Sequence, residues 1–271
     1  MGKFKRNQRI GGLMKVLSDN PNKIFTYNYF CNRFKAAKST ISEDIVIAKE
    51  LTNELELGYI ETIAGYSGGV KFIPTLSKEY IKEFLYELCT KLSSEDRIIP
   101  GGFVYMTDIL YSPSIAKNIG KIFSGCFKGY GIDYVITVET KGIPIALMTA
   151  HMLNCPLVII RRNIKVTEGS TVNINYVSGS TRQIQTMSLS RRSIKEKSKI
   201  LIIDDFMKAG GTAKGMEDMM KEFKAEVVGI GVLISTKNPQ DKLVNNYISL
   251  LTLDEVVEKE NKIIIYPSER V

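Results

Sequence analysis

The residues with the clearest capacity for chemistry are Asp204 and Asp205, which follow an apolar run and precede a turn of small residues. The full stretch reads Ile200-Leu201-Ile202-Ile203-Asp204-Asp205-Phe206-Met207-Lys208-Ala209-Gly210-Gly211-Thr212. Backbone amides of a glycine-containing turn, followed by the start of a helix, form a binding site for an anion such as a phosphate. We therefore expect an anion cradle over residues 204–212, in which the two glycines let the backbone approach the ligand and Thr212 adds a hydroxyl.

Two carboxylates beside a bound phosphate would repel it unless they bind another part of the same ligand. Ribose hydroxyls are suitable partners, either directly or through a divalent cation such as Mg²⁺. The stretch therefore describes a site for a ribose 5-phosphate. The sequence contains no Gly-x-x-x-x-Gly-Lys-Ser/Thr motif, which excludes the P-loop mode of binding a nucleoside triphosphate.

A cradle of this kind needs a sheet to position it, and from about residue 75 short apolar runs alternate with helical stretches. Continuously apolar strands separated by helices are typical of a parallel sheet covered on both faces. Ligands of such sheets bind beyond the carboxyl ends of the strands, which is where Asp204 and Asp205 fall. We predict strands over 103–106, 134–138, 157–160, 200–203 and 227–233, and helices over 80–92, 114–127, 145–153 and 212–223.

Basic residues are concentrated near the N-terminus. The chain has 37 Lys and Arg against 29 Asp and Glu, a net charge of +8. Residues 1–49 contain ten Lys or Arg and three Asp or Glu, which gives +7 for this segment alone. A clustered positive charge attracts a polyanion, either nucleic acid or a membrane surface. The alternative is a solvated basic face without a partner. The predicted fold of the segment distinguishes between these two interpretations.

The basic segment begins with two predicted helices. Apolar residues at helical spacing predict a first helix over 6–19, which Asn20-Pro21 ends because the residue before a proline avoids helical geometry. Thr26 is a suitable N-cap for a second short helix that extends to Phe34.

A third helix and a hairpin complete the pattern of a winged helix-turn-helix. The third helix begins at Ser39 or Thr40, where Thr40-Ile41-Ser42-Glu43 matches a capping box. Two β-rich runs, 57–63 and 70–73, flank a turn of Gly and Ser and predict the hairpin that forms the wing. The apolar face of the third helix is predicted to contain Ile41, Ile45, Ala48 and Leu55.

We expect the third helix to enter the major groove of DNA, as the second helix of a helix-turn-helix motif does. Its short polar side chains, Ser39, Thr40 and Ser42, are suited to hydrogen bonds with base edges or phosphates. A winged helix used for protein contacts is the alternative, but the excess charge lies in the same segment as the fold pattern, which favours DNA. The expected phosphate contacts come from Lys5, Arg6, Arg9, Arg33, Lys35, Lys38 and Lys71.

The stretch 200–212 resembles the phosphoribosyl pyrophosphate (PRPP) motif of the type I phosphoribosyltransferases, which has four hydrophobic residues, two acids and a small Thr/Gly-rich turn. Val138-Glu139-Thr140-Lys141-Gly142-Ile143-Pro144, also between a strand and a helix, is similar to the loop that holds pyrophosphate in that family. The resemblance implies that Thr140, Lys141 and Gly142 join residues 204–212 at a PRPP site. Phe206-Met207-Lys208 depart from the usual transferase pattern.

Two further features lie near these motifs. Runs 171–176 and 184–188 predict a hairpin, and the basic residues 191–197 follow it, in the position of the flexible loop that closes over the ligand in this family. Tyr105 has two interpretations, contact with the pyrophosphate or packing against the protein.

A winged helix followed by a phosphoribosyltransferase-like domain is similar to the purine operon repressors of Gram-positive bacteria, which resemble xanthine phosphoribosyltransferases in their C-terminal half. The likeness covers essentially the whole chain and includes residues 36–45, 68–71, 175–180 and 204–212. It implies a homodimer that binds operator DNA upstream of purine genes and is released by PRPP without catalysing transfer. Other nucleotides that carry a diphosphate stay open as competitors for the cradle.

An active purine or xanthine phosphoribosyltransferase with an appended nucleic-acid-binding domain is the alternative. Base transfer often needs a group that manages the purine proton. The chain has one histidine, His151, in the middle of a predicted helix, and we interpret it as structural. Because Asp204 and Asp205 are assigned to the ribose, we predict no catalytic residue and no transferase activity.

Length and composition set the remaining expectations. A chain of 271 residues predicts two domains, a winged-helix DNA-binding domain over 1–74 and a phosphoribosyltransferase-like effector-binding domain over 75–271. No apolar run approaches the roughly 20 residues that cross a bilayer, and no signal peptide is evident, so we expect a cytoplasmic protein without membrane partners. The four cysteines lack metal-ligand spacing, so we expect reduced thiols, no metal bound by protein ligands alone, and no obligatory cofactor.

Overall fold

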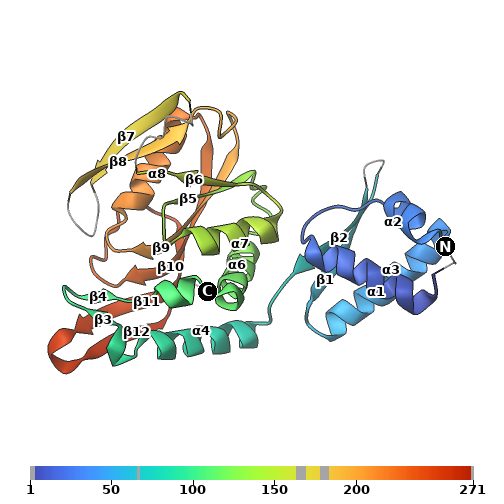
Figure 1. Ribbon diagram of the computed structural model, residues 1–271, viewed down its shortest axis with the longest axis horizontal. Helices are drawn as coiled ribbons and strands as arrows, with labels where there is room; N and C mark the ends of the chain where they lie inside the picture. Colours follow the sequence, from blue (N-terminus) through green and yellow to red (C-terminus); the bar gives the residue numbers. More distant parts are fainter. Residues whose placement is uncertain (1–3, 66–67, 163–168, 178–182, 270–271) are drawn as a thin grey trace. The chain divides into compact units, whose positions relative to one another are not determined.

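The computed structural model of the protein describes residues 4–65, 68–162, 169–177 and 183–269. Within these ranges the chain divides into two compact units, which are described separately (Figure 1). The first unit extends to Ser77 and also takes in His151–Asn154. The second contains residues 78–150 and the chain from Cys155 onward.

The first unit has the predicted winged-helix arrangement of three helices and a hairpin (Figure 1). The two strands of the hairpin are antiparallel, with Tyr59 opposite Ile73, and the turn between them includes residues 66–67, which lie outside the described ranges. Apolar residues from all five elements meet in one core. The elements are α1 (Arg6–Asp19), α2 (Tyr27–Phe34), α3 (Lys38–Glu54), β1 (Gly58–Ile63) and β2 (Gly69–Pro74).

Capping residues were predicted for two helices of this unit, and one of these predictions is confirmed while the other is wrong. Thr26 caps α2 as predicted, since its Oγ1 accepts a hydrogen bond from the backbone N–H of Tyr29 at 3.2 Å. The predicted capping box at the start of α3 is wrong, because Ala37 is the N-cap and no side chain caps the helix. Leu55, expected in the core, follows the end of α3 and is 58% exposed, and Thr52 takes the buried position instead.

The second unit is built around a six-stranded sheet in the order β12-β11-β10-β9-β5-β6. Its strands are parallel except for β12, which is antiparallel to β11, so the predicted mainly parallel α/β architecture is confirmed. The sheet strands are β5 (Tyr134–Val138), β6 (Leu157–Ile160), β9 (Lys199–Met207), β10 (Glu226–Thr236), β11 (Tyr247–Val257) and β12 (Lys262–Pro267).

The remaining elements in the described residues are helices and two small hairpins. The strand predicted over 103–106 is present only at Phe103–Val104, and it pairs with the strand before it in a separate two-stranded sheet instead of joining the main sheet. The elements are α4 (Lys78–Leu92), η1 (Glu95–Arg97), β3 (Ile98–Ile99), β4 (Phe103–Val104), α5 (Thr107–Leu110), α6 (Pro113–Cys126), α7 (Ile143–Leu153), β7 (Thr171–Val177), β8 (Ile184–Ser190), α8 (Gly211–Glu222) and η3 (Glu258–Glu260).

The central strand β9 is apolar at every position from Ile200 to Ile203 because both faces of the sheet are covered. Ile200 and Ile202 belong to the core that contains the methionines of α8. On the other face, glycines of β10 make room for the rings of Phe123 in α6 and Phe127, the C-cap residue of this helix. A Cβ on Gly231 would lie 2.8 Å from Phe123, and one on Gly229 would lie 2.4 Å from Phe127. Both glycines therefore let α6 approach the sheet closely.

The hairpin β7–β8 packs on α8. A Cβ on Gly215 of α8 would lie 3.0 Å from the Cβ of Tyr176, so the absence of a side chain lets the hairpin come close. The two strands are antiparallel, with Ile174 opposite Met187, as the sequence predicted. Residues 178–180, which belong to a segment named for its family likeness, lie outside the described ranges.

Candidate functional site

The predicted cradle lies where β9 ends and α8 begins. β9 is longer than predicted and includes both aspartates, Phe206 and Met207, so the turn itself is confined to residues 208–210. Gly210 is the N-cap of α8 and has a φ of +84°, a left-handed conformation that glycine adopts without a steric cost. No side chain caps this helix, so its first backbone N–H groups are available as anion donors.

A pocket opens at this turn, with a volume of about 400 Å³ that includes open solvent. Lys208 is exposed at its rim, whereas Gly210, Gly211 and the carboxyl group of Asp204 are buried. Most of the residues predicted for the cradle are thus brought together around one hollow. The lining residues are Asp204, Phe206, Met207, Lys208, Gly210, Gly211, Thr212, Ala213 and Val232.

Asp204 is the most perturbed acid of the site. Its side chain is 5% exposed, and its Oδ1 accepts a hydrogen bond from the backbone N–H of Asp205 at 3.0 Å. Burial raises the pKa of Asp204 well above its ordinary value, and the neighbouring charge of Asp205 raises it further. A ligand that brings hydroxyl donors or a cation to this carboxyl group would relieve both effects, because it would stabilise the charged form.

The second predicted loop meets the cradle. β5 and β9 are parallel neighbours, so the loop after β5 lies at the same edge of the sheet as the turn after β9. Gly142 is buried, and a Cβ on it would lie 2.6 Å from Thr137 Oγ1 and 3.3 Å from Asp204 Oδ1. Thr140 and Lys141 of the same loop are exposed. The structure therefore joins the two motifs through backbone contact at Gly142.

Glu139 anchors the start of this loop. Its carboxylate accepts a hydrogen bond from the backbone N–H of Arg162 at 2.7 Å and one from Arg161 Nη1 at 3.2 Å. Both arginines follow β6, the edge strand next to β5. The loop is thus fixed from one side by β6 and from the other by β9.

A further group of residues stabilises the turn after β9 through hydrogen bonds, and the sequence did not indicate it. Lys242 Nζ donates hydrogen bonds to the carbonyl oxygen of Lys208, to the carbonyl oxygen of Thr236 at 2.8 Å and to Thr236 Oγ1 at 3.2 Å. The backbone N–H of Leu243 donates to the carbonyl of Ala209 at 2.9 Å. Burial lowers the pKa of Lys242. No local motif could have indicated the contacts to Lys208 and Ala209, because the Lys242–Lys208 hydrogen bond joins residues that are 34 positions apart.

Tyr105 and His151 lie outside the pocket lining just described. Tyr105 is 45% exposed, and its backbone exchanges hydrogen bonds with Arg97, one from its N–H at 2.7 Å and one to its carbonyl at 3.1 Å. Arg97 also binds Asp108 through two hydrogen bonds of 2.8 and 2.9 Å. His151 is exposed near the end of α7. Contact of Tyr105 with pyrophosphate stays a prediction.

The first unit presents most of the predicted DNA-contact residues on its surface. Along α3, Ile41 and Ile45 are buried, whereas Ser39, Ser42 and Lys38 are exposed and Thr40 is half-buried. Of the other basic candidates, Lys71 is partly occupied by an ion pair of 3.2 Å with Glu61. The exposed ones are Lys5, Arg6, Arg33 and Lys35.

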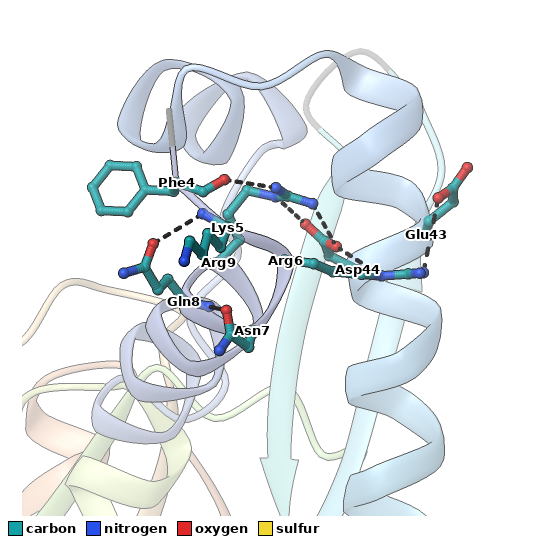
Figure 2. A network of polar contacts seen from close by, with 8 residues as sticks. All are labelled: Phe4, Lys5, Arg6, Asn7, Gln8, Arg9, Glu43 and Asp44. Atoms are coloured by element: carbon teal, nitrogen blue, oxygen red, sulfur yellow. Dashed lines mark hydrogen bonds and ion pairs between the residues drawn. The ribbon is translucent and has the colours of Figure 1, made fainter. Parts of the chain in front are cut away.

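Arg9 differs from its prediction as a phosphate contact. Its side chain is buried, and Nε and Nη2 bind the two carboxylate oxygens of Asp44 at 2.6 and 3.1 Å, while Nη1 binds the carbonyl oxygen of Phe4 at 2.9 Å (Figure 2). Asp44 is itself buried, and its hydrogen bond with the guanidinium group raises the pKa of Arg9. With all of its nitrogens engaged inside the unit, Arg9 cannot also bind a DNA phosphate.

Other kinds of site are not apparent in the parts of the chain that the structure describes. No helix there is long and apolar enough to cross a membrane. The same residues contain no cluster of three or more His, Cys, Asp or Glu that could hold a metal ion. Cys31, Cys89, Cys126 and Cys155 are free thiols.

A winged helix and a phosphoribosyltransferase fold in one chain define a class of transcription regulators, and two family models agree with this. Residues 5–74 match "Bacterial purine repressor, N-terminal", and residues 106–265 match "Phosphoribosyl transferase domain". The purine biosynthesis transcriptional repressor PurR of Bacillus subtilis (strain 168) is 48% identical over 96% of this chain and 92% of its own length. The chain therefore belongs to the family of bacterial purine biosynthesis transcriptional regulators, as the sequence predicted.

Other relatives show how the two halves are related to known proteins. A purine biosynthesis transcriptional activator PurR of Lactococcus lactis subsp. lactis (strain IL1403) is 39% identical over 93% of both chains. A xanthine phosphoribosyltransferase of Lactococcus lactis subsp. cremoris (strain MG1363) is 33% identical over 65% of this chain and 96% of its own length. The adenine phosphoribosyltransferase structure from Rhodothermus marinus covers 65% of this chain and all of its own, with a TM-score of 0.54 and 21% identity, which shows the shared fold.

Proposed function

We propose that the protein binds operator DNA upstream of purine biosynthesis genes as a cytoplasmic homodimer, represses them, and dissociates when PRPP occupies the cradle at residues 204–212. One observation carries this proposal: a winged helix with exposed basic and hydroxyl side chains occurs in the same chain as a cradle with a buried carboxyl group. The proposed domain boundary lies after residue 74.

The DNA contacts of this proposal are divided by chemistry. Ser39 and Ser42, exposed at the N-terminal end of α3, bind base edges or nearby phosphates in the major groove. The exposed cations around them neutralise backbone phosphates. Each neutralised phosphate contributes about −0.9 to the slope of the logarithm of the affinity against the logarithm of the salt concentration. These cations are Lys5, Arg6, Arg33, Lys35 and Lys38.

The PRPP contacts follow from the donors and acceptors of the cradle. The backbone amides at the start of α8 and the Thr212 hydroxyl bind the 5-phosphate. Lys208 adds a cation beside it, which favours tight binding. Asp204 and Asp205 accept hydrogen bonds from the ribose hydroxyls or share a Mg²⁺ with them. Residues 140–142 hold the pyrophosphate, and other nucleotides that carry a diphosphate compete for the same groups.

Release from DNA requires that PRPP bind the free protein more tightly than the operator complex. By linkage, operator DNA then weakens PRPP binding by the same factor, and a coupling of about 1–3 kcal/mol corresponds to roughly 5–150-fold. This reciprocity gives the proposal two independent measurements.

The experiment is a fluorescence-anisotropy titration of a labelled purine-gene upstream fragment, with and without PRPP and Mg²⁺, at stated salt concentrations. We expect PRPP to weaken binding of the wild type at least fivefold. The variant Asp204→Ala with Asp205→Ala should bind the fragment with wild-type affinity and no longer respond to PRPP. Loss of DNA binding by this variant, or a wild type that ignores PRPP, contradicts the assignment.

Transferase activity is the alternative that the 33% identical xanthine phosphoribosyltransferase favours. Against it, the relatives that match over almost the whole chain are named transcription regulators. We propose that the cradle binds PRPP without transferring its phosphoribosyl group. Incubation with PRPP, Mg²⁺ and each purine base, followed by a pyrophosphate assay, should give no release above the protein-free control; turnover with any base contradicts the proposal.

The direction of regulation has its own test, because a 39% identical relative is named an activator. The 48% identical relative is named a repressor, and we adopt repression on that ground. In a purified transcription reaction on a purine-gene promoter, the protein should lower transcript yield and PRPP should restore it. A rise in transcript on addition of the protein contradicts repression but leaves DNA binding intact.

A further inference from the structure

The N-terminal arm, which we define as residues 4–6, is held to the rest of the first unit by three contacts. The ring of Phe4 contacts the ring of Phe34 edge-on, with centroids 5.8 Å apart. Its carbonyl oxygen accepts a hydrogen bond from Arg9 Nη1 at 2.9 Å, and the backbone N–H of Lys5 donates to Gln8 Oε1 at 2.9 Å. The side chains of Lys5 and Arg6 remain exposed while their backbone is held in place.

Arg9 also links the arm to α3. It is 8% exposed and Asp44 is 1% exposed, and they form a two-point contact in which the guanidinium fork matches the carboxylate (Figure 2). Arg9 lies in the first turns of α1, and Asp44 lies in α3 two residues after Ser42. One buried pair therefore connects the start of α1, the arm and the end of α3 that carries the exposed hydroxyls.

Stability alone does not account for this pair. An apolar pair of similar volume often replaces a buried ion pair without loss of stability, because both charges must be removed from water. The surroundings are apolar, since Leu13 and Ile41 of the same two helices are fully buried. An apolar residue at position 9 could fill the space, but it could not hold the carbonyl oxygen of Phe4.

Charge gives a second argument. Asp44 and Glu43 would repel a phosphate backbone that approaches the N-terminal end of α3. Arg9 compensates Asp44, and Arg6 lies 3.8 Å from Asp44 and 3.8 Å from Glu43 (Figure 2). The exposed Arg6 side chain is held loosely enough at this distance to exchange these carboxylates for a phosphate.

We infer that Arg9 and Asp44 are positioning residues of the DNA interface: they hold the arm beside the N-terminal turns of α3, so that Lys5 and Arg6 bind backbone phosphates of the duplex that α3 contacts. This inference rests on the proposed DNA-binding function. It assigns to Arg9 an indirect role in place of the phosphate contact that the sequence predicted.

The test is the salt dependence of operator affinity for Arg9→Lys, which keeps the charge but cannot make the two-point contact. We expect about tenfold weaker binding at moderate salt and a logarithmic salt slope lower by about 1–2, since up to two phosphates lose their contacts at about 0.9 each. To separate positioning from folding, the double variant Arg9→Met with Asp44→Leu is measured beside it. This double variant should melt at or above the melting temperature of the wild type. Its operator affinity and its salt slope should still be lower than those of the wild type.

Direct removal of the arm charges provides the matched comparison. Lys5→Gln with Arg6→Gln should lower the slope by the same amount, and adding Arg9→Lys to it should cause no further loss, because Arg9 acts through the arm. Lys15→Gln removes a charge of α1 outside the arm, where Lys15 pairs with Asp19 at 2.8 Å, and should leave the slope unchanged.

The outcomes separate this inference from the function on which it rests. If Lys5→Gln with Arg6→Gln lowers the slope but both Arg9 variants, verified as folded, bind like the wild type, the positioning role is overturned and DNA binding stands. Additive losses from the arm and Arg9 variants also overturn it. If the wild type shows no salt-dependent binding to the operator, the proposed function and the inference fail together.

Discussion

Gly142 lies against Asp204: a methyl group added to Gly142 would sit 3.3 Å from the Oδ1 of Asp204 and 2.6 Å from Thr137 Oγ1. Gly142 belongs to the loop after β5, and Asp204 lies in the C-terminal half of β9. Two sequence motifs that are more than sixty residues apart thus approach each other so closely that Gly142 has no room for a side chain. The proposed pyrophosphate and ribose contacts depend on the same backbone position.

Gly142→Ala should damage the PRPP site more than the fold. Overpacking typically costs about 1–3 kcal/mol, and here the neighbours that must move are the side chain of Thr137 and the carboxyl group of Asp204. We expect at least tenfold weaker PRPP binding by calorimetry, with operator affinity unchanged. Gly125→Ala on α6 is the control, because no heavy atom lies within 4 Å of its added Cβ. Equal PRPP affinities for the two variants would show that Gly142 has no such role.

Asp204 makes the stability of the empty protein depend on pH. Burial and the charge of Asp205 raise its pKa well above the ordinary 3.8. Between 3.8 and the raised value, the folded state holds a proton that the unfolded state has lost, so stability falls as pH rises through this range.

Asp204→Asn removes this dependence while keeping an oxygen that accepts the hydrogen bond from Asp205. Its melting temperature should exceed that of the wild type at neutral pH, by about 2–4 °C for each kcal/mol relieved. The difference should shrink as the pH is lowered to the ordinary value of 3.8 and below, where the carboxyl group becomes protonated in the unfolded state as well. Asp241→Asn, at an exposed position, should follow the wild-type profile. A lower melting temperature for Asp204→Asn at pH 8 would contradict the assigned pKa direction.

Lys242 should contribute to ligand affinity without touching the ligand. Its ammonium group donates hydrogen bonds to the carbonyl oxygen of Lys208 and to both oxygens of Thr236, so Lys242→Met removes one donor from three acceptors. The carbonyl oxygen of Lys208 keeps the Thr236 hydroxyl as a donor at 3.2 Å. We expect the turn at residues 208–210 to lose its fixed geometry and PRPP affinity to fall about tenfold, measured by calorimetry. Lys221→Met, on the exposed side of α8, is the control. Wild-type affinity in Lys242→Met would show that the turn needs no such support.

The hydroxyls and cations of α3 should differ in what they do to DNA binding. Ser42→Ala should weaken operator binding by up to about tenfold and leave the salt slope and the affinity for unrelated DNA unchanged, if its contact is to a base. Lys38→Gln should weaken binding to both DNAs and lower the slope by about 0.9. Anisotropy titrations on two duplexes at three salt concentrations distinguish these patterns. The reverse assignment would place Ser42 at the phosphates.

The fold was predictable wherever periodicity was strong. β5 and β6 begin and end at the predicted residues, because a continuous apolar run in a covered sheet has clear limits. The short segment after residue 102 was predicted as a sheet strand from composition alone, whereas in the structure it pairs only within a two-residue hairpin. Strand pairing is a tertiary property, and composition contains no information about partners.

The site was predictable as far as its chemistry is local. The cradle depends on one continuous stretch, so its position at the end of β9 followed from the sequence. Lys242 and the burial of Arg9 were not predictable, because each depends on contacts between segments distant in the chain. A basic residue in a basic segment gives no sign that its charge points inward until Asp44 is placed opposite it. Buried charge pairs are thus the main source of error.

The rings of Phe123 in α6 and Phe127 at its C-cap fill the space beside Gly231 and Gly229 of β10, and this packing restricts the movement of α6 against the sheet. Phe123 and Phe127 are one helical turn apart. Both rings would have to leave their positions at the glycines before α6 could slide along the sheet or rotate about its own axis. We therefore expect the sheet and α6 to keep their packing when a ligand binds. On this ground we expect any rearrangement that changes DNA binding to begin in the loops at the strand ends.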